Sequence, residues 1–276
     1  MFNEFNKISI NFKELKTHKL IFENPFLLEI KKNDIKYEFL IRLKKNSNKL
    51  IVLGSGAYQK STGKLPLFHR HSWIPEFNES VIFYNDPTLY LGHLSLGWGF
   101  GTSKKHFLSE ISIIIKDIVE KLKYDYENVY YYGSSAGGFM SLMLASMMKG
   151  STAIVNNPQT ILINYHQNYV NSLLKVVGIS KDEAINNFYD RIDVTYRFKK
   201  ENYIPKIYYL QNILVEHDVI NHLQPFLNGL ITTDKDIINN RIHIELYFDP
   251  KRGHNPVSKS ETIQFIEKVM YNENKP

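Results

Sequence analysis

The chain has 276 residues, which is enough for one medium-sized domain with a large buried core. Hydrophobic residues make up 43 % and charged residues 22 %, values that are ordinary for a soluble globular protein. The chain contains no cysteine, which excludes disulfides, thiolate metal sites and a cysteine nucleophile. Its formal net charge of +6 comes from basic residues scattered among acids, so it indicates either ordinary surface composition or attraction for an anionic partner. No nucleic-acid-binding module accompanies this charge.

The sequence predicts neither a signal peptide nor a membrane span. Residues 1–20 mix Asn, Lys, Glu and Phe without an apolar run. The longest apolar stretch, at 111–119, is interrupted by Lys116 and Asp117 and is too short to cross a bilayer. We therefore expect a cytoplasmic location, with which the lack of cysteine agrees. The oligomeric state is left open.

Strand-like and helix-like segments alternate along most of the chain. Strands are expected at 27–31, 35–43, 49–53, 81–84, 128–132, 153–155, 207–214 and 242–248. Helices are expected at 104–123, 139–148 and 262–270. The first two strands read as an antiparallel hairpin, and the later alternation predicts a mainly parallel sheet with helices on both faces. We expect one α/β domain over residues 1–276, with a lid inserted at about 160–200.

A short motif near the middle of the chain is typical of a nucleophile elbow. The run 129–132 predicts a strand, Gly133-Ser134-Ser135-Ala136-Gly137 has the form Gly-x-Ser-x-Gly, and a helix rich in small residues, Met and Leu follows. Such a turn strains the serine backbone, so its neighbours must be small, as Gly133 and Gly137 are. We predict that Ser135 is a nucleophile. The alternative is a glycine turn that only packs a helix on a strand.

A serine hydroxyl needs a base to take its proton and an acid to orient that base. In this architecture the acid and then the histidine follow later strands. His254 lies in a short loop after the strand at 242–248, and Asp218 follows the strand at 207–214. We predict His254 as the base and Asp218 as the acid, with Glu216 and Asp249 as alternative acids.

Acyl transfer also needs backbone donors for an oxyanion. We predict the N–H of Ala136 as one donor and that of Gly56 or Ala57, after the strand at 49–53, as the other. Ser55 in the same loop is a rival nucleophile, but no helix follows it. His217 and His222 flank Asp218, yet no third ligand is spaced to complete a metal site, so no metal is expected.

Further side chains are candidates for substrate contact. Arg70, Lys251 and Arg252 would hold a phosphate, or are solvated loop cations. Trp98 would stack on a sugar or fill the core, and Trp73 is expected in the core. His222 would support the site or touch the substrate, or only pack in the interior.

The elbow at Ser135, the late Asp218 and the late His254 resemble the α/β-hydrolase superfamily. Within it, the chain is most similar to bacterial capsular polysaccharide O-acetyltransferases of the meningococcal serogroup A type. That likeness is carried by 132–138, by Asn157-Pro158-Gln159 and by Asp218-x-x-x-His222-Leu223.

The resemblance implies that a Ser135-His254-Asp218 triad moves acetyl from acetyl-CoA to a hydroxyl of a bacterial polysaccharide, with Gln159 near the substrate. The partners would then be a small acyl donor and a glycan acceptor. One alternative is an esterase or deacetylase acting on carbohydrates or small esters. Another is a scaffold protein that keeps the fold without turnover.

Overall fold

The computed structural model describes residues 2, 4–58, 64–231 and 235–271. The strands are β1 Asn6–Asn11, β2 Phe26–Lys32, β3 Ile35–Arg42, β4 Leu50–Gly54, β5 Ser80–Tyr84, β6 Val129–Ser135, β7 Thr152–Pro158, β8 Lys206–Asn212 and β9 Ile242–Tyr247. The α-helices are α1 Phe107–Leu122, α2 Ala136–Met147, α3 Gln167–Val177, α4 Lys181–Asn187, α5 Tyr189–Ile192, α6 Val194–Glu201, α7 Glu216–Asp218, α8 Gln224–Ile231, α9 Lys235–Arg241 and α10 Lys259–Tyr271. Short 3₁₀ turns (η1 Phe12–Glu14, η2 His71–Glu76, η3 Pro87–Tyr90, η4 Tyr126–Asn128 and η5 Leu162–Asn164) and a π-helical turn (η6 Val219–Leu223) complete the elements.

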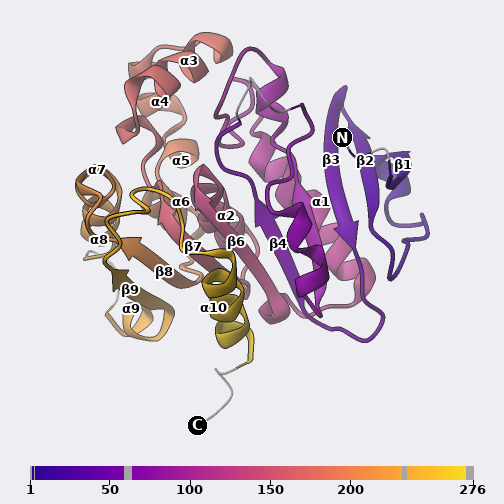
Figure 1. Ribbon diagram of the computed structural model, residues 1–276. Coiled ribbons are helices and arrows are strands. Elements are labelled where there is room, and N and C mark those ends of the chain that lie inside the picture. Colours follow the sequence, from indigo (N-terminus) through magenta and orange to yellow (C-terminus); the bar gives the residue numbers. More distant parts are fainter. Residues whose placement is uncertain (1, 3, 59–63, 232–234, 272–276) are drawn as a thin grey trace.

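The strands form one sheet in the order β1-β2-β3-β5-β4-β6-β7-β8-β9 (Figure 1). Strand β3 runs antiparallel to both β2 and β5, and all other neighbours are parallel. The predicted mainly parallel sheet with an N-terminal antiparallel hairpin is therefore confirmed. Parallel strands end at one edge of the sheet, and the residues that follow β6, β8 and β9 meet there.

Helices cover both faces of the sheet, and each face has its own apolar core. On one face, α1, α2, α6 and α8 contribute buried side chains to a large cluster. On the other face, α10 packs Ile266, Val269 and Met270 against strand residues such as Ile51 and Tyr130. Burial on both faces explains why the central strands read as nearly continuous apolar runs.

The structure differs from the sequence-based expectation at β1 and at the start of α2, among other places. Strand β1, which pairs with β2, was not predicted, because its sequence alternates only two isoleucines with polar residues. Helix α2 begins at Ala136, three residues before the expected start, because the chain turns directly from β6 into the helix at Ser135. The two glycines in its first turn are poor helix formers and obscured this boundary.

The connection from β7 to β8, where a lid was expected, is mostly helical. It contains η5 and helices α3 to α6, and Figure 1 shows α3 and α4 at the top of the molecule, above α5 and α6. Helix α6 buries Val194 and Phe198 in the main core, so it belongs to the layer that covers the sheet. Within the described residues, no helix is long and apolar enough to cross a membrane.

Candidate active site

The sharp turn between β6 and α2 presents Ser135. Its backbone has φ 56° and ψ −125°, a combination that side-chain-bearing residues seldom adopt. The carbonyl of Ser135 accepts a hydrogen bond from the backbone N–H of Gln159, at 3.2 Å, and this contact helps to hold the strained turn. Ser135 is thereby partly accessible at the carboxyl edge of the sheet, while its chain neighbours are buried.

Close backbone contacts explain the small residues around the turn. A Cβ on Gly133 would lie 2.2 Å from the carbonyl of Gly137, and one on Gly137 would lie 2.7 Å from the carbonyl oxygen of Gly54. A Cβ on Gly138 would lie 2.6 Å from the ring of Pro158. Strand β6, helix α2 and the end of β4 therefore approach each other at distances that only glycine permits.

The structure brings Ser135, His254 and Asp218 into one chain of hydrogen bonds. His254 Nε2 lies 2.9 Å from Ser135 Oγ, and His254 Nδ1 lies 2.5 Å from Asp218 Oδ2. The carboxylate of Asp218 can only accept, so Nδ1 carries the proton and Nε2 is free to accept the hydroxyl proton. The Asp218 side chain is 2 % exposed and that of His254 is 34 % exposed, so the acid is shielded while the base faces the solvent side.

The two alternative acids do not contact His254. Glu216 is exposed at the start of α7. The carboxylate of Asp249 accepts from the backbone of Lys251 and Arg252 and forms an ion pair with the Arg252 side chain, at 2.9 Å. The geometry thus selects Asp218 from the three acids considered.

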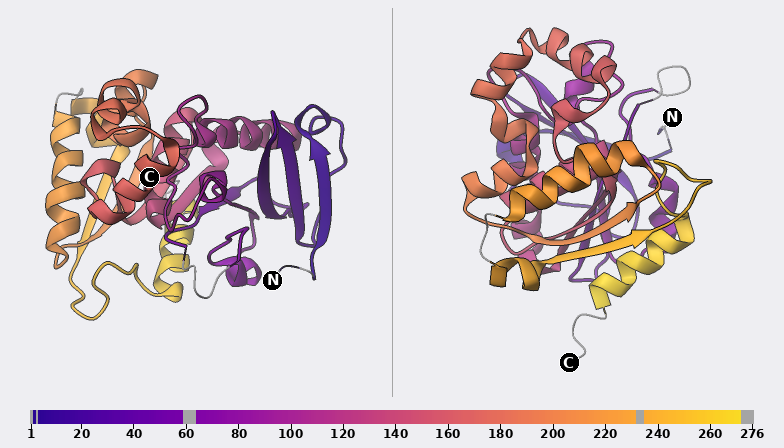
Figure 2. Two further views of the ribbon diagram at one scale, coloured as in Figure 1. Left: turned by 90° about the horizontal axis from the view of Figure 1, so that it is seen from above. Right: turned by 90° about the vertical axis from the view of Figure 1, so that its left-hand side faces the viewer.

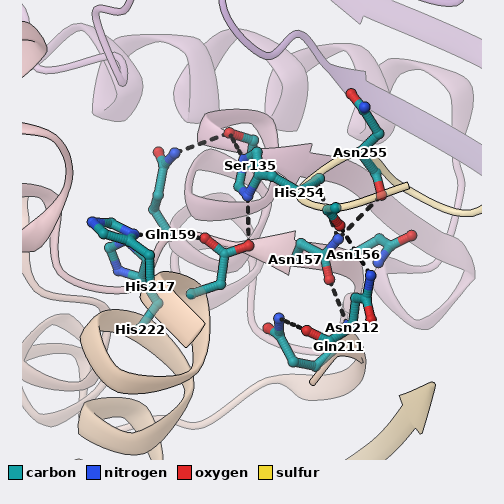
Figure 3. Close-up of polar contacts among 12 residues, drawn as sticks. Ser135, Asn156, Asn157, Gln159, Gln211, Asn212, His217, His222, His254 and Asn255 are labelled. Atoms are coloured by element: carbon teal, nitrogen blue, oxygen red, sulfur yellow. Dashed lines mark hydrogen bonds and ion pairs between the residues drawn. The ribbon is translucent and has the colours of Figure 1, made fainter. Parts of the chain in front are cut away.

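Gln159 makes a second contact to the nucleophile (Figure 3). Its Nε2 donates to Ser135 Oγ at 2.9 Å, and its Oε1 accepts from the indole N–H of Trp98 at 2.5 Å. Because an indole can only donate, Trp98 fixes the orientation of the amide so that its NH₂ group points at the hydroxyl. Ser135 Oγ consequently accepts from Gln159 while it donates to His254.

This contact changes the interpretation of Trp98. The Trp98 side chain is 1 % exposed and packs edge-to-face with Tyr165, so it cannot stack on a sugar in solution. Of its two expected roles, filling the core is the one that the structure shows. Trp73, in contrast, is only partly buried, and it packs against the core on the α10 face.

Two buried asparagines, whose role was not predicted from the sequence, hold the loop that carries His254. Asn157, at the end of β7, donates to the carbonyls of His254 and Asn255 and accepts from the backbone N–H of Asn212 (Figure 3). Asn212, at the end of β8, donates to the carbonyls of Asp249 and Gly253. Asparagine at the ends of two adjacent parallel strands was the available signal, because those ends meet at one edge.

The loop after β4 lies beside the elbow, as the predicted oxyanion hole requires. A Cβ on Gly56 would be 3.7 Å from the carbonyl oxygen of Ser134, and Ala57 is exposed. The N–H of Ala136 is at the start of α2, where the first backbone donors of a helix have no partner within it. A cavity of about 10 Å³ opens between these segments and is lined by Gly56, Trp98, Ala136 and Met140, among others.

The hydroxyl of Ser55, the rival nucleophile, is bound to backbone groups of a neighbouring loop. Its hydroxyl donates to the carbonyl of Leu67 at 3.2 Å and accepts from the backbone N–H of His69 at 3.0 Å. The side chain is 8 % exposed. These contacts tie the loop after β4 to the segment that precedes Arg70.

Arg70 lies next to the elbow. Its guanidinium donates to Ser134 Oγ at 2.6 Å and stacks near the rings of Trp73 and Tyr132. Among the described residues no acid forms an ion pair with it, whereas Arg252 is paired with Asp249 and Glu261. Arg70 is therefore the better placed of these two arginines to hold an anionic group near Ser135.

His222 is buried, so it cannot touch a substrate directly. It is 0 % exposed, and its Nδ1 faces the backbone N–H of Thr160 at 3.4 Å. Burial lowers the pKa of His222 to about 3, so the ring is neutral. Through its contacts with Thr160, His222 connects the start of the β7–β8 connection to the helical turn after Asp218.

The segment after β7 also contributes rings to the site. The ring centroids of Tyr165 and His254 lie 6.3 Å apart. Burial raises the pKa of the Tyr165 hydroxyl to about 12. The exposed His166 stacks on His217 with ring centroids 4.3 Å apart. No group of three or more potential metal ligands is arranged around an ion position in the described part of the chain.

Comparison with known proteins identifies the fold. The capsule O-acetyltransferase of Neisseria meningitidis serogroup A is similar with a TM-score of 0.68 and 18 % identity, over 94 % of this chain and 98 % of that chain. A mutant of the same enzyme in complex with CoA has a TM-score of 0.63 and 19 % identity, over 88 % and 94 % of the two chains. The acylaminoacyl peptidase of Pyrococcus horikoshii is similar with a TM-score of 0.60 and 13 % identity, over 90 % of this chain but only 40 % of that chain.

The chain has the α/β-hydrolase fold. The resemblance expected from the sequence is thus confirmed at the level of the fold. Neither the protein-family models nor the curated proteins gave a match. In the α/β-hydrolase fold a serine nucleophile stands on the strand-to-helix elbow, with the acid and the histidine on later loops. Ser135, Asp218 and His254 occupy those places in this chain.

Proposed function

We propose that the protein is a serine-dependent acyltransferase that moves acetyl from acetyl-CoA to a hydroxyl group of a bacterial polysaccharide. The observation that carries the proposal is the hydrogen-bonded chain from Ser135 Oγ through His254 to the buried Asp218 carboxylate, on a strained elbow. The similarity of this chain to a solved capsule O-acetyltransferase, along nearly the whole length of both chains, supports the choice of reaction class.

In the first half-reaction, Ser135 Oγ attacks the carbonyl carbon of the thioester while its proton passes to His254 Nε2. The oxyanion that forms is held by the N–H of Ala136 and an N–H from Gly56 or Ala57. The C–S bond then breaks, and the leaving sulfur of CoA takes the proton from His254. Asp218 stabilises the imidazolium while it exists. The product is an acetyl ester on Ser135.

In the second half-reaction, the acceptor hydroxyl attacks this ester and gives its proton to His254. The bond from the acetyl carbon to Ser135 Oγ breaks, and Oγ recovers the proton. Gln159 donates to Oγ in the resting state, so it favours the negative charge that develops there as the proton leaves.

Two further features agree with a small acyl group and an anionic ligand. The cavity beside Ala136 is about 10 Å³, space for one water-sized group, so it fits a methyl better than a longer chain. Arg70 offers a cation next to the nucleophile, suited to a phosphate of CoA or of an anionic polymer. The Arg252 guanidinium is already paired with Asp249 and Glu261, so it is less suited to bind a phosphate.

The decisive experiment is mass spectrometry of the protein after exposure to acetyl-CoA. We expect acetyl on the peptide that contains Ser135 in the wild type and in Ser55→Ala, and none in Ser135→Ala. Release of CoA is then followed with and without candidate polysaccharides. Release that requires the acceptor supports transfer, and equal release without it supports the esterase alternative.

A non-catalytic scaffold gives a different result. In that case neither acetyl-CoA nor a fluorophosphonate probe modifies Ser135, although circular dichroism shows a folded protein. That outcome contradicts the proposal as a whole.

A further inference from the structure

Strand β9 lies at the end of the sheet. Among the described residues it pairs with β8 on one side and with no strand on the other. The carbonyl of Tyr247 accepts from the N–H of Ile213 at 3.0 Å, so the backbone groups of Tyr247 face β8. Because these groups alternate along a strand, those of Ile242, Ile244 and Leu246 face outward.

Apolar side chains are exposed beside this edge. Ile244, Leu246 and Phe248 are 36 %, 50 % and 69 % exposed. Leu227 and Ile231 of α8 are also exposed, and α8 and β9 both lie on the side turned to the viewer in the right-hand view of Figure 2. Exposed apolar surface along an edge strand is typical of an interaction site.

The β9 sequence, Ile-His-Ile-Glu-Leu-Tyr, has few of the devices that usually protect an edge strand, and Glu245 is its one carboxylate. It has no lysine and no proline, and its register with β8 runs without a bulge over 242–247. A strand of this kind pairs readily with another strand.

We propose that the protein forms a two-fold symmetric homodimer in which β9 pairs antiparallel with β9 of a second copy. With Ile244 on the symmetry axis, Ile244 faces itself and Ile242 faces Leu246 of the other copy. All of these residues have outward-facing backbone groups, so they form the hydrogen-bonded pairs of the ladder.

The same register places the charged and polar side chains in complementary positions. His243 faces Glu245 of the other copy, and the two-fold axis repeats the pair. These are the non-hydrogen-bonded positions, where side chains on opposite strands approach most closely. An imidazole N–H opposite a carboxylate is a favourable pair whether or not the ring is charged.

Neighbouring registers are less favourable. An axis at residue 245 places Glu245 against Glu245, which is repulsive. An axis at residue 243 pairs His243 with itself and leaves Leu246 opposite residue 240, outside the strand. Only the register centred on Ile244 pairs the complementary side chains and keeps the apolar residues together.

The surface beside the edge has space for the partner. A groove of about 390 Å³ runs along β9 on the α10 face and is lined by residues that include Tyr208, His243, Phe265 and Lys268. His243 stacks on Tyr208 in this groove, with ring centroids 4.6 Å apart. The side chain of Glu245 from the second copy would enter at this level.

Cysteine cross-linking tests both the dimer and its register, since the chain has no cysteine of its own. In Ile244→Cys the two Cα atoms would lie about 5.5 Å apart, within disulfide range. In Leu246→Cys the same atoms would lie about 14 Å apart. Under mild oxidation we expect a covalent dimer from Ile244→Cys and none from Leu246→Cys. Equal cross-linking of both variants, or of neither, overturns the proposed pairing.

Light scattering after gel filtration tests the assembly without modification. We expect twice the chain mass of 32.4 kDa for the wild type and for Ile113→Lys, an exposed position on α1. Ile244→Pro removes an outward N–H that β8 does not use, so we expect a folded monomer. A monomeric wild type, or an Ile244→Pro variant that stays dimeric, overturns the proposal. Neither result depends on catalytic activity.

Discussion

At the scale of single residues, the site depends on groups whose surroundings fix their protonation and direction. Trp98 orients Gln159, Gln159 donates to Ser135, and Asp218 sets the tautomer of His254. These directions are determined because the Trp98 indole can only donate and the Asp218 carboxylate can only accept.

Replacing the acid tests the orientation of the base. Asp218→Asn keeps the size of the side chain but presents an amide to His254 Nδ1, which favours the wrong tautomer. We expect kcat for CoA release to fall by a factor on the order of 10⁴, with little change in the far-UV circular dichroism. The exposed neighbour Glu216→Gln is the control and should retain activity. Loss of activity in both variants, or in neither, contradicts the assignment of Asp218.

His222 should make the stability of the fold depend on pH. Burial lowers its pKa from 6.5 to about 3, so between these values the unfolded chain binds a proton that the folded chain does not. This contribution to stability is therefore complete above pH 6.5 and is lost as the pH falls towards 3. Between these two pKa values, the free energy of unfolding changes by about 1.4 kcal/mol per pH unit.

The measurement is urea unfolding at several pH values for the wild type and His222→Asn, whose amide oxygen can still accept from Thr160. We expect the variant to be less stable at pH 7 but to lose less stability on acidification. Parallel curves for the two proteins would show that His222 does not titrate in this way. Other buried histidines affect both proteins equally, so the difference isolates His222.

At the scale of elements, the ends of β7 and β8 position the histidine loop. Asn157 and Asn212 connect to each other and to four backbone carbonyls between residues 249 and 255. The loop that follows β9 therefore depends on side chains from two neighbouring strands. Buried amides of this kind are costly to disturb, because the groups left behind lose their partners.

Asn212→Ala should release the loop from β8. We expect stability to fall by about 1–3 kcal/mol and kcat per folded molecule to fall about 10- to 100-fold, since His254 is no longer held at one position. Ser151→Ala is the matched control, because it removes a buried hydrogen bond to the carbonyl of Met148. Ser151 directly precedes β7 and therefore lies at the end of the sheet opposite to the site. The Ser151→Ala variant should lose stability without losing kcat. Unchanged kcat in Asn212→Ala would show that the loop is held by other contacts.

At the scale of the whole molecule, the site joins distant parts of the chain. Ser135 and His254 are separated by 119 residues, and they meet only because β6, β7, β8 and β9 are neighbours in one sheet. The site should therefore disappear when the sheet unfolds and not earlier.

A fluorophosphonate probe measures this coupling. We expect labelling of Ser135 in increasing urea to fall with the same midpoint as the far-UV circular dichroism, as in a two-state transition. The Ser135→Ala variant gives the background of the assay. Labelling that is lost well before the circular dichroism changes would show that the site opens locally while the sheet persists.

The sequence by itself determined the order of most strands, and it singled out Ser135, Asp218 and His254, which the structure brings together. Gly133-Ser134-Ser135-Ala136-Gly137 between a strand and a helix predicted the elbow, because its chemistry is local: small residues and a strained turn in adjacent positions. The strand periodicity and the positions of Asp218 and His254 after later strands were equally readable, since chain order in this fold is fixed.

Only the tertiary structure decided which polar groups meet. It selected Asp218 over Glu216 and Asp249, assigned Trp98 to the interior, and connected Asn157 and Asn212 to the histidine loop. It also revealed the β1 pairing and the open edge at β9. These facts depend on which segments lie side by side across the sheet, and neither residue type nor local periodicity carries that information.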